Sequence, residues 1–172
     1  MTVAVTDACI FIDCYKLGCL DDLFALPYAI HTTQDVYLEC DTFHPALDAH
    51  ELKGRLMIVE SEDELGSEFA EASKGLSDPD LTVPAYALQI PAAIILTSDA
   101  KLRKFCKQLN LVVHGSLWVF EELIICGHWS FSHAIEVAEL LALRNRRAPQ
   151  KLIKECCKAW SRNETYLNSN NS

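Results

Sequence analysis

Short apolar segments alternate with helix-like segments through the first two thirds of this chain, and this alternation constrains the fold more than any other feature. Five apolar segments have the length and composition of strands: residues 3–6, 28–32, 56–60, 93–97 and 111–113. Strands that alternate with helices form a parallel sheet with helices on both faces. The sequence therefore predicts an α/β fold, a three-layer sandwich with a central parallel sheet.

The predicted helices share polar capping residues at their starts and an apolar face. They cover residues 8–17, 33–40, 61–73, 77–89, 101–109, 117–126, 130–145 and 149–160. Thr33 caps the second, Ser61 the third, and Ser77 or Asp78 the fourth. The last three follow one another without a strand, so we expect C-terminal helices packed on the sheet, with the last helix as an alternative docking surface.

The length of 172 residues suits one domain with a substantial core and is short for two. We expect one domain over residues 1–160 and a disordered C-terminal tail over residues 161–172. No apolar stretch approaches the roughly 20 residues of a membrane helix, and the first residues lack the basic leader of a secretory signal. These features predict a cytoplasmic protein without a membrane segment.

The eight cysteines are predicted to be reduced thiols, most of them buried. None forms the closely spaced ligand pairs of a zinc site. A disulfide framework is typical of small secreted proteins, which this chain does not resemble.

Four acidic residues stand where apolar segments end or helices begin: Asp7, Glu39, Asp80 and Asp99. The carboxyl ends of parallel strands meet at one edge of the sheet, where Asp7 and Asp99 would lie. A buried carboxylate is costly unless a cation neutralises it, and hard divalent ions take oxygen ligands. The pattern favours a Mg²⁺ or Mn²⁺ site and hydrolysis of a phosphodiester.

Each acid also has a purely structural interpretation. Asp7 and Asp99 could cap the helices that follow them, Asp80 could favour a helix N-terminus through the dipole, and Glu39 could be a solvated helix residue. Capping does not require the four side chains to converge, whereas a metal site does.

The net charge of −9 would by itself disfavour a nucleic-acid partner, but the charge is unevenly distributed. Residues 1–100 carry a net charge of −14, and residues 101–172 carry +5. Lys101, Arg103 and Lys104 closely follow Asp99 and are candidate RNA-binding residues, because phosphates need cationic positioning. A second basic group near the C-terminus fits either a binding surface or a solvated helix face: Arg144, Arg146, Arg147, Lys151, Lys154, Lys158 and Arg162.

Four motifs, in this order, resemble those of the PIN-domain family of metal-dependent ribonucleases. They lie at residues 5–12, 33–40, 76–88 and 95–102, and the resemblance covers roughly residues 1–120. It implies that Asp7 is the central metal ligand with Asp99 opposite, and that Glu39 and Asp80 complete an acidic pocket. The implied cofactor is Mg²⁺ or Mn²⁺, the implied substrate is RNA, and the implied products carry 5′-phosphate and 3′-hydroxyl ends.

The resemblance also assigns supporting roles near these acids. Thr97 would orient the site by hydrogen bonding. Asp78 is a second acid close to Asp80, and we favour Asp80 because it lies just inside the helix. Cys9 departs from the family pattern, which usually has a small hydroxyl or amide side chain there. Because a thiol is a weak donor, a non-catalytic PIN-like module that binds RNA or a protein partner is the alternative function.

The biological role is open between two kinds of PIN protein. The size and single-domain layout resemble the toxin subunits of bacterial toxin–antitoxin pairs, whose small antitoxin partner inserts into the acidic pocket. Other PIN proteins of this size act in RNA processing without an inhibitor. Family members often form homodimers, and four aromatic residues could serve either a dimer interface or the core: Trp118, Phe120, Trp129 and Phe131.

Overall fold

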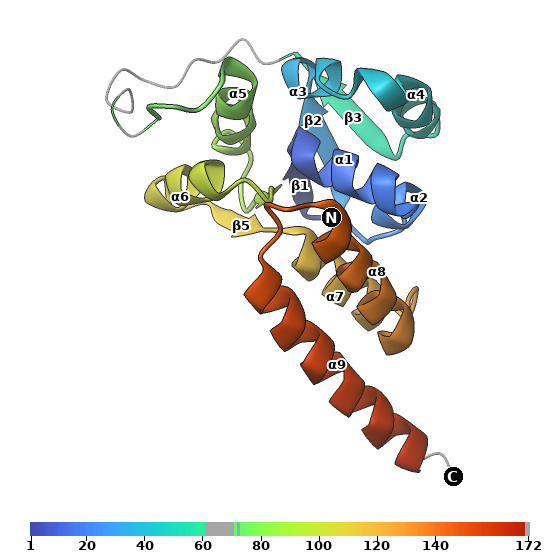
Figure 1. Ribbon diagram of the computed structural model, residues 1–172. Coiled ribbons are helices and arrows are strands. Elements are labelled where there is room, and N and C mark those ends of the chain that lie inside the picture. The colour runs from blue at the N-terminus through green and yellow to red at the C-terminus, as the bar shows by residue number, and fades with distance from the viewer. Residues whose placement is uncertain (61–70, 72, 171–172) are drawn as a thin grey trace.

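Five parallel strands form the centre of the molecule (Figure 1). The computed structural model describes residues 1–60, 71 and 73–170. The strands are β1 (Val3–Thr6), β2 (Ala29–Thr33), β3 (Leu56–Val59), β4 (Ile94–Leu96) and β5 (Val112–His114). Their order across the sheet is β3-β2-β1-β4-β5, and every neighbouring pair is parallel. The predicted parallel sheet is confirmed.

The helices are close to those predicted, with two additions. Their bounds are α1 (Ala8–Leu17), α2 (Leu20–Leu23), α3 (Gln34–Leu38), α4 (His44–Leu52), α5 (Asp78–Ala87), α6 (Ala100–Gln108), α7 (Ser116–Ile125), α8 (Phe131–Arg144) and α9 (Gln150–Asn170). The short helices α2 and α4 were not predicted, although Pro45 in the first turn of α4 is a usual start signal. The predicted acidic helix over residues 61–73 lies almost entirely outside the described residues.

Helices cover both faces of the sheet, which makes the fold a three-layer sandwich. Helix α5 packs across β1, β2 and β4, and α6 packs against β5. On the opposite face, α1 contacts α2 and α8 (Figure 1). The central strands are apolar and buried on both sides, as a parallel sheet between two helical layers requires; Val5, Ile95 and Leu96 are fully buried.

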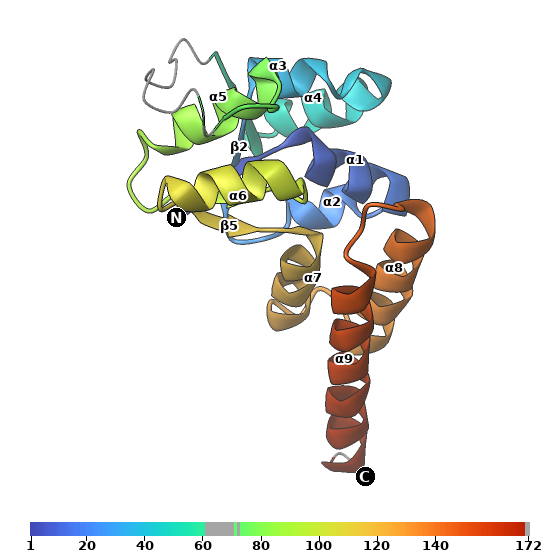
Figure 2. The same cartoon turned by 60° about the vertical axis from the view of Figure 1, so that its left-hand side comes forward.

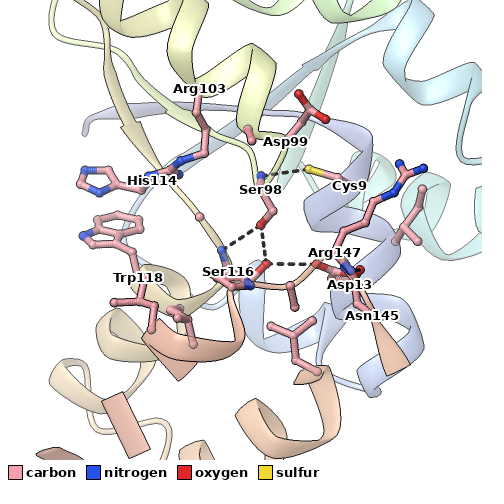
Figure 3. Close-up of a pocket in the computed structure, with 18 of the residues that line it drawn as sticks. Cys9, Asp13, Ser98, Asp99, Arg103, His114, Ser116, Trp118, Asn145 and Arg147 are labelled. Atoms are coloured by element: carbon pink, nitrogen blue, oxygen red, sulfur yellow. Dashed lines mark hydrogen bonds between the residues drawn. The ribbon is translucent and has the colours of Figure 1, made fainter. Parts of the chain in front are cut away.

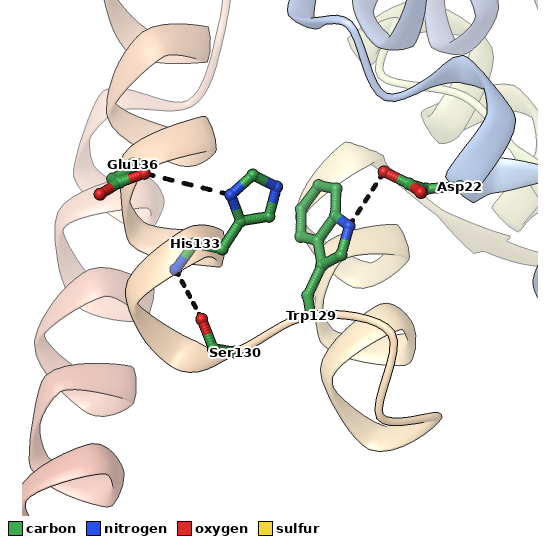
Figure 4. Close-up of polar contacts among 5 residues, drawn as sticks. All are labelled: Asp22, Trp129, Ser130, His133 and Glu136. Atoms are coloured by element: carbon green, nitrogen blue, oxygen red, sulfur yellow. Dashed lines mark hydrogen bonds and ion pairs between the residues drawn. The ribbon is translucent and has the colours of Figure 1, made fainter.

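The C-terminal helices form a subdomain-like group that is tied to the rest by polar contacts. Helices α8 and α9 pack against each other, and α9 projects away from the sheet (Figure 2). Trp129 Nε1 donates to Asp22 Oδ2 on α2 at 3.0 Å, and Ser130 caps α8 by accepting from the His133 backbone (Figure 4). The Trp129 contact connects the group to α2, and the Ser130 cap fixes the start of α8.

Helix α9 is longer than the helix predicted from the sequence. We expected an end near Trp160, but the helix continues to Asn170. The added residues are mostly polar but contain neither proline nor glycine, so nothing in them stops a helix. The division into a domain of residues 1–160 and a disordered tail stays a prediction.

The four aromatic residues that could serve either the core or a dimer interface differ in how deeply they are buried. Phe120 is fully buried and Trp129 is nearly so, while Trp118 and Phe131 are half-buried against the core. Phe120 and Trp129 therefore belong to the core, Trp118 and Phe131 pack against it, and a homodimer stays a prediction. All eight cysteines are free. None of the helices in the described part of the chain has the length and apolarity needed to cross a bilayer.

The packing of α7 generates a stability prediction with an internal control. Leu123 is fully buried, whereas Ile125 on the same helix is 75% exposed. We expect Leu123→Ala to lower the free energy of unfolding by about 2–5 kcal/mol, because it removes buried methyl groups and leaves a cavity. Ile125→Ala should change it by less than about 0.5 kcal/mol. Urea denaturation of both variants would check this; similar losses would contradict the described packing.

Candidate active site

Asp7 lies at the carboxyl end of the central strand, and its side chain does not form the usual capping hydrogen bond of the helix that follows. Its backbone N–H donates to Leu96 O at 3.0 Å, so Asp7 extends the pairing between β1 and β4. It occupies the N-cap position of α1, yet its carboxylate makes no capping hydrogen bond. The residue is only 3% exposed. The capping interpretation therefore fails for Asp7, and the carboxylate is left for another task.

Two side chains hold this carboxylate in place. Thr97 Oγ1 donates to Asp7 Oδ2 at 2.7 Å, and Cys9 Sγ donates to the same oxygen at 2.8 Å. Both donors are fixed in turn: Thr97 Oγ1 accepts from Asp99 N at 3.1 Å, and Cys9 Sγ accepts from Ser98 N at 3.1 Å. Burial raises the pKa of Asp7, and these two hydrogen bonds act in the opposite direction.

Cys9 performs the orienting role that a hydroxyl would have. Burial raises the pKa of the Cys9 thiol well above its usual value, and the negative charge of Asp7 raises it further. The thiol therefore stays protonated and donates a hydrogen bond to the Asp7 carboxylate. At the position where Cys9 departs from the family pattern, the thiol thus supplies a hydrogen bond to Asp7.

Glu39 and Asp80 approach the same region from two helices. Glu39 is exposed at the C-terminal end of α3, and Asp80 is half-buried in the first turn of α5. Burial raises the pKa of Glu39, and the charges of Asp7 and Asp80 raise it further. The charge of Asp80 also raises the pKa of Asp7. The three carboxylates thus lie within electrostatic range of one another.

Local hydrogen bonds position the two helices that carry these acids. Thr33, which caps α3, pairs with Thr82 on α5 through their hydroxyl oxygens at 2.6 Å. Asp80 and Ser77 form a capping box: Ser77 N donates to Asp80 Oδ2 at 2.8 Å, and Asp80 N donates to Ser77 Oγ at 3.3 Å. Asp80 therefore combines a structural role with its place beside Asp7.

Asp99 differs from the other three acids because its side chain caps a helix. Asp99 Oδ1 accepts from the backbone N–H groups of Lys101 and Leu102, both at 2.8 Å, at the start of α6. Its backbone N–H is joined to Asp7 through Thr97 Oγ1. The structure thus brings Asp99 next to the site but gives one of its carboxylate oxygens the capping task that the sequence left open.

The donor chemistry of Asp7, Glu39 and Asp80 fits a hard divalent cation. The salt bridges of the described residues leave all three carboxylates without a cationic partner. A bound cation would remove the mutual repulsion that raises the pKa values of Asp7 and Glu39. In the described part of the chain, no three His, Cys, Asp or Glu side chains already form a metal-binding group. The acids therefore lie near one another, but their side chains do not have the arrangement of a formed metal site.

The predicted RNA-binding residues lie on α6, beside these acids. Arg103 Nη1 donates to Thr97 O at 3.0 Å, and Lys101 Nζ lies 3.5 Å from Gly75 O. Gly115 leaves space for the Arg103 guanidinium, since an added Cβ would lie 3.1 Å from Arg103 Nη1. Lys101, Arg103 and Lys104 all line a groove that also contains Asp80 and Asp99. Figure 3 shows Arg103 and Asp99 in this groove.

A second polar cluster, which we did not predict, lies in the same groove. Asp13 on α1 is 7% exposed, and its Oδ2 accepts from Ser116 Oγ at 3.2 Å. Ser116 Oγ also pairs with Ser98 Oγ at 2.9 Å, and Asn145 Nδ2 donates to Asp13 Oδ1 at 3.1 Å. Burial raises the pKa of Asp13. The only sequence signal was an acid on the buried face of an apolar helix.

The comparisons with known proteins agree with this architecture. A family model described as a PIN domain matches residues 3–162. The chain therefore belongs to the PIN-domain family and has a nuclease-like fold. PIN domains are generally nucleases and usually use divalent metals. No curated protein matches the chain.

The uncompensated charge of Asp7 predicts that its removal stabilises the metal-free protein. We expect Asp7→Asn to raise Tm by about 2–4 °C, the effect of ~1 kcal/mol in a domain of this size. Asparagine has nearly the same shape and an oxygen that can still accept hydrogen bonds, but it carries no buried charge. Added Mg²⁺ or Mn²⁺ should raise the Tm of the wild type and not that of the variant.

The same comparison has a defined pH dependence. A carboxyl group whose folded pKa is raised destabilises the fold fully above that pKa; the cost declines as the pH falls below it and is gone once the pH is below the unfolded pKa. The Tm difference between Asp7→Asn and the wild type should therefore be large at neutral pH and shrink in acid. Differential scanning fluorimetry over this range would measure it. A wild type that melts above the variant at neutral pH without metal would contradict the prediction.

Proposed function

We propose that this PIN domain is a divalent-metal-dependent ribonuclease that hydrolyses RNA phosphodiester bonds. The observation that carries the proposal is the buried Asp7 carboxylate, which caps no helix and is oriented by Thr97 and Cys9. The charges of Glu39 and Asp80 act on it, and the salt bridges of the described residues include no counter-ion for any of the three. Such an arrangement is costly for a protein that has no use for a cation.

In the proposed site, acidic residues would hold the metal ion and two neighbouring side chains would orient the central acid. Asp7, Glu39 and Asp80 would hold Mg²⁺ or Mn²⁺, with Asp99 as the fourth ligand. The bound ion lowers the pKa of water and stabilises charge on the phosphate. Thr97 and Cys9 fix the orientation of the central carboxylate by donating to one of its oxygens.

Acidic residues at this centre would accept the proton of the attacking water, and basic residues beside it would bind the substrate. Glu39 or Asp80 would accept a proton from the attacking water. Lys101, Arg103 and Lys104 would position the RNA phosphates beside the acids. The absence of a preformed metal group among the described residues favours the second candidate, a PIN-like module that binds RNA or a protein without cleaving it.

The toxin role within this proposal rests on size and layout alone. In that role a small antitoxin protein would enter the acidic pocket and inhibit cleavage in the cytoplasm. An RNA-processing role would need no such partner.

Cleavage of labelled RNA with Mg²⁺ or Mn²⁺ tests the proposed activity. We expect Asp7→Asn and Asp80→Asn to lower the rate by about 100-fold or more, because each removes a charged ligand from the ion. Asp78→Asn is the matched control, since Asp78 is exposed and lies two residues from Asp80; it should stay within about twofold. Equal cleavage by wild type and Asp7→Asn would indicate a contaminant. No cleavage by any folded variant over a range of RNAs would favour the binding module.

Two substitutions at Cys9 test whether the thiol orients Asp7. Cys9→Ala removes the donor and should lower the metal-dependent rate about 10–100-fold, the usual effect of losing a group that orients a metal ligand. Cys9→Ser restores a hydroxyl donor and should cleave at least as fast as the wild type. Measuring both rates at saturating metal separates orientation from metal affinity. An unchanged rate in Cys9→Ala would mean that the thiol contact has no catalytic value.

A further inference from the structure

Three arginines at the junction of α8 and α9 lie on the groove that contains Asp80 and Asp99. We call Arg144, Arg146 and Arg147 the arginine turn; Arg144 ends α8, and the other two follow in the turn. All three are exposed and line the groove. Figure 3 shows Arg147 of this turn and Arg103 of α6 among the side chains that surround the groove. Basic residues from two distant parts of the sequence therefore border one groove.

The arginine turn is held in place by a buried carboxylate. Asn145 Nδ2 donates to Asp13 Oδ1 at 3.1 Å, and Asn145 Oδ1 accepts from Arg147 N at 3.0 Å. A further hydrogen bond joins the Arg144 guanidinium to Lys16 O on α1. Because Asp13 is itself almost buried, the turn is anchored to the helix that begins at Asp7. Asn145 thus positions the arginines relative to the acidic site.

The groove is lined by more basic than acidic residues, which favours an anionic ligand. Eight basic residues line it: Lys16, Lys101, Arg103, Lys104, Lys107, Arg144, Arg146 and Arg147. The acids that line it are only four: Asp13, Asp80, Asp99 and Glu121. Asp13 and Asp99 are already engaged by hydrogen bonds within the chain. No salt bridge of the described residues uses any of the eight bases. These cations therefore keep their charge for a ligand, although Arg103 and Arg144 also donate to the backbone carbonyls of Thr97 and Lys16.

We propose that the arginine turn binds backbone phosphates of a single RNA strand, which lies in the groove between the turn and α6 and passes the acidic site. This inference rests on the proposed ribonuclease function and adds a binding surface to it. Guanidinium groups match phosphate geometry and stay charged at all relevant pH values. Bases on two sides of a groove suit an extended polyanion better than a single small anion.

Binding of a fluorescein-labelled single-stranded RNA tests the proposal. Asp7→Asn serves as the background, without added metal, so that no cleavage occurs. We expect Arg146→Gln/Arg147→Gln to weaken binding by about 10-fold and to reduce the slope of log K against log salt by about 1.4, the value for two lost phosphate contacts on a single strand. The matched control is Lys154→Gln/Lys158→Gln, which removes the same charge from exposed residues of α9 outside the groove. The control should stay within about twofold of its background.

A charge-neutral variant separates positioning from overall charge. Asn145→Ala keeps every arginine but releases the turn from Asp13, so RNA binding should weaken by a few-fold while Tm identifies any loss of folding. Equal losses in the arginine and lysine pairs, or no loss in the arginine pair, would overturn the proposal. So would competition by polyglutamate as strong as competition by unlabelled RNA, which would assign the groove to an acidic protein segment.

The two proposals can fail separately. If cleavage depends on Asp7 but the arginine variant binds RNA as well as its background, the proposed role of the arginine turn is wrong and the ribonuclease proposal stands. Weakened binding in that variant, with no cleavage by the wild type, would leave an RNA-binding groove on a non-catalytic module.

Discussion

The buried carboxylate of Asp7 is the constraint on which the rest of the site depends. It lies at the end of the central strand, where burial raises its pKa, and it receives hydrogen bonds from Thr97 and Cys9. The Thr97 contact joins the ends of the neighbouring strands β1 and β4, whereas the Cys9 contact comes from the first turn of α1. The charge of Asp80 acts on this carboxylate, and its own uncompensated charge is what a cation would relieve.

The segment 97–99 links this centre to the surrounding elements through one short stretch of chain. Thr97 contacts Asp7, the Ser98 backbone supports Cys9, and Asp99 caps α6. The Ser98 hydroxyl pairs with Ser116, which continues to Asp13 on α1. A displacement of this segment would therefore disturb the acidic centre, the basic helix α6 and the anchor of the arginine turn together.

Much of the fold could be predicted from local sequence patterns, whereas the division of roles within the site could not. The apolar strands and the capping residues Thr33 and Ser77 gave the order of elements, because these signals act over a few residues. Asp7 and Asp99 look alike in sequence, each following a strand and preceding a helix. Only the structure distinguishes them: Asp99 caps α6, and Asp7 leaves α1 uncapped by its side chain.

The contact between Asp13 and Asn145 shows why the rest was beyond sequence reasoning. The two residues are 132 positions apart, and neither belongs to a motif. Their hydrogen bond, together with the one from Arg144 to Lys16 O and the packing of α8 on α1, holds the C-terminal arginines beside the acidic first half of the chain. In an acidic protein of net charge −9, a polyanion can approach the carboxylates only where fixed cations flank them. The buried carboxylate of Asp13 would by itself repel RNA. Through its hydrogen bond with Asn145, however, it helps to hold the arginines that would attract RNA.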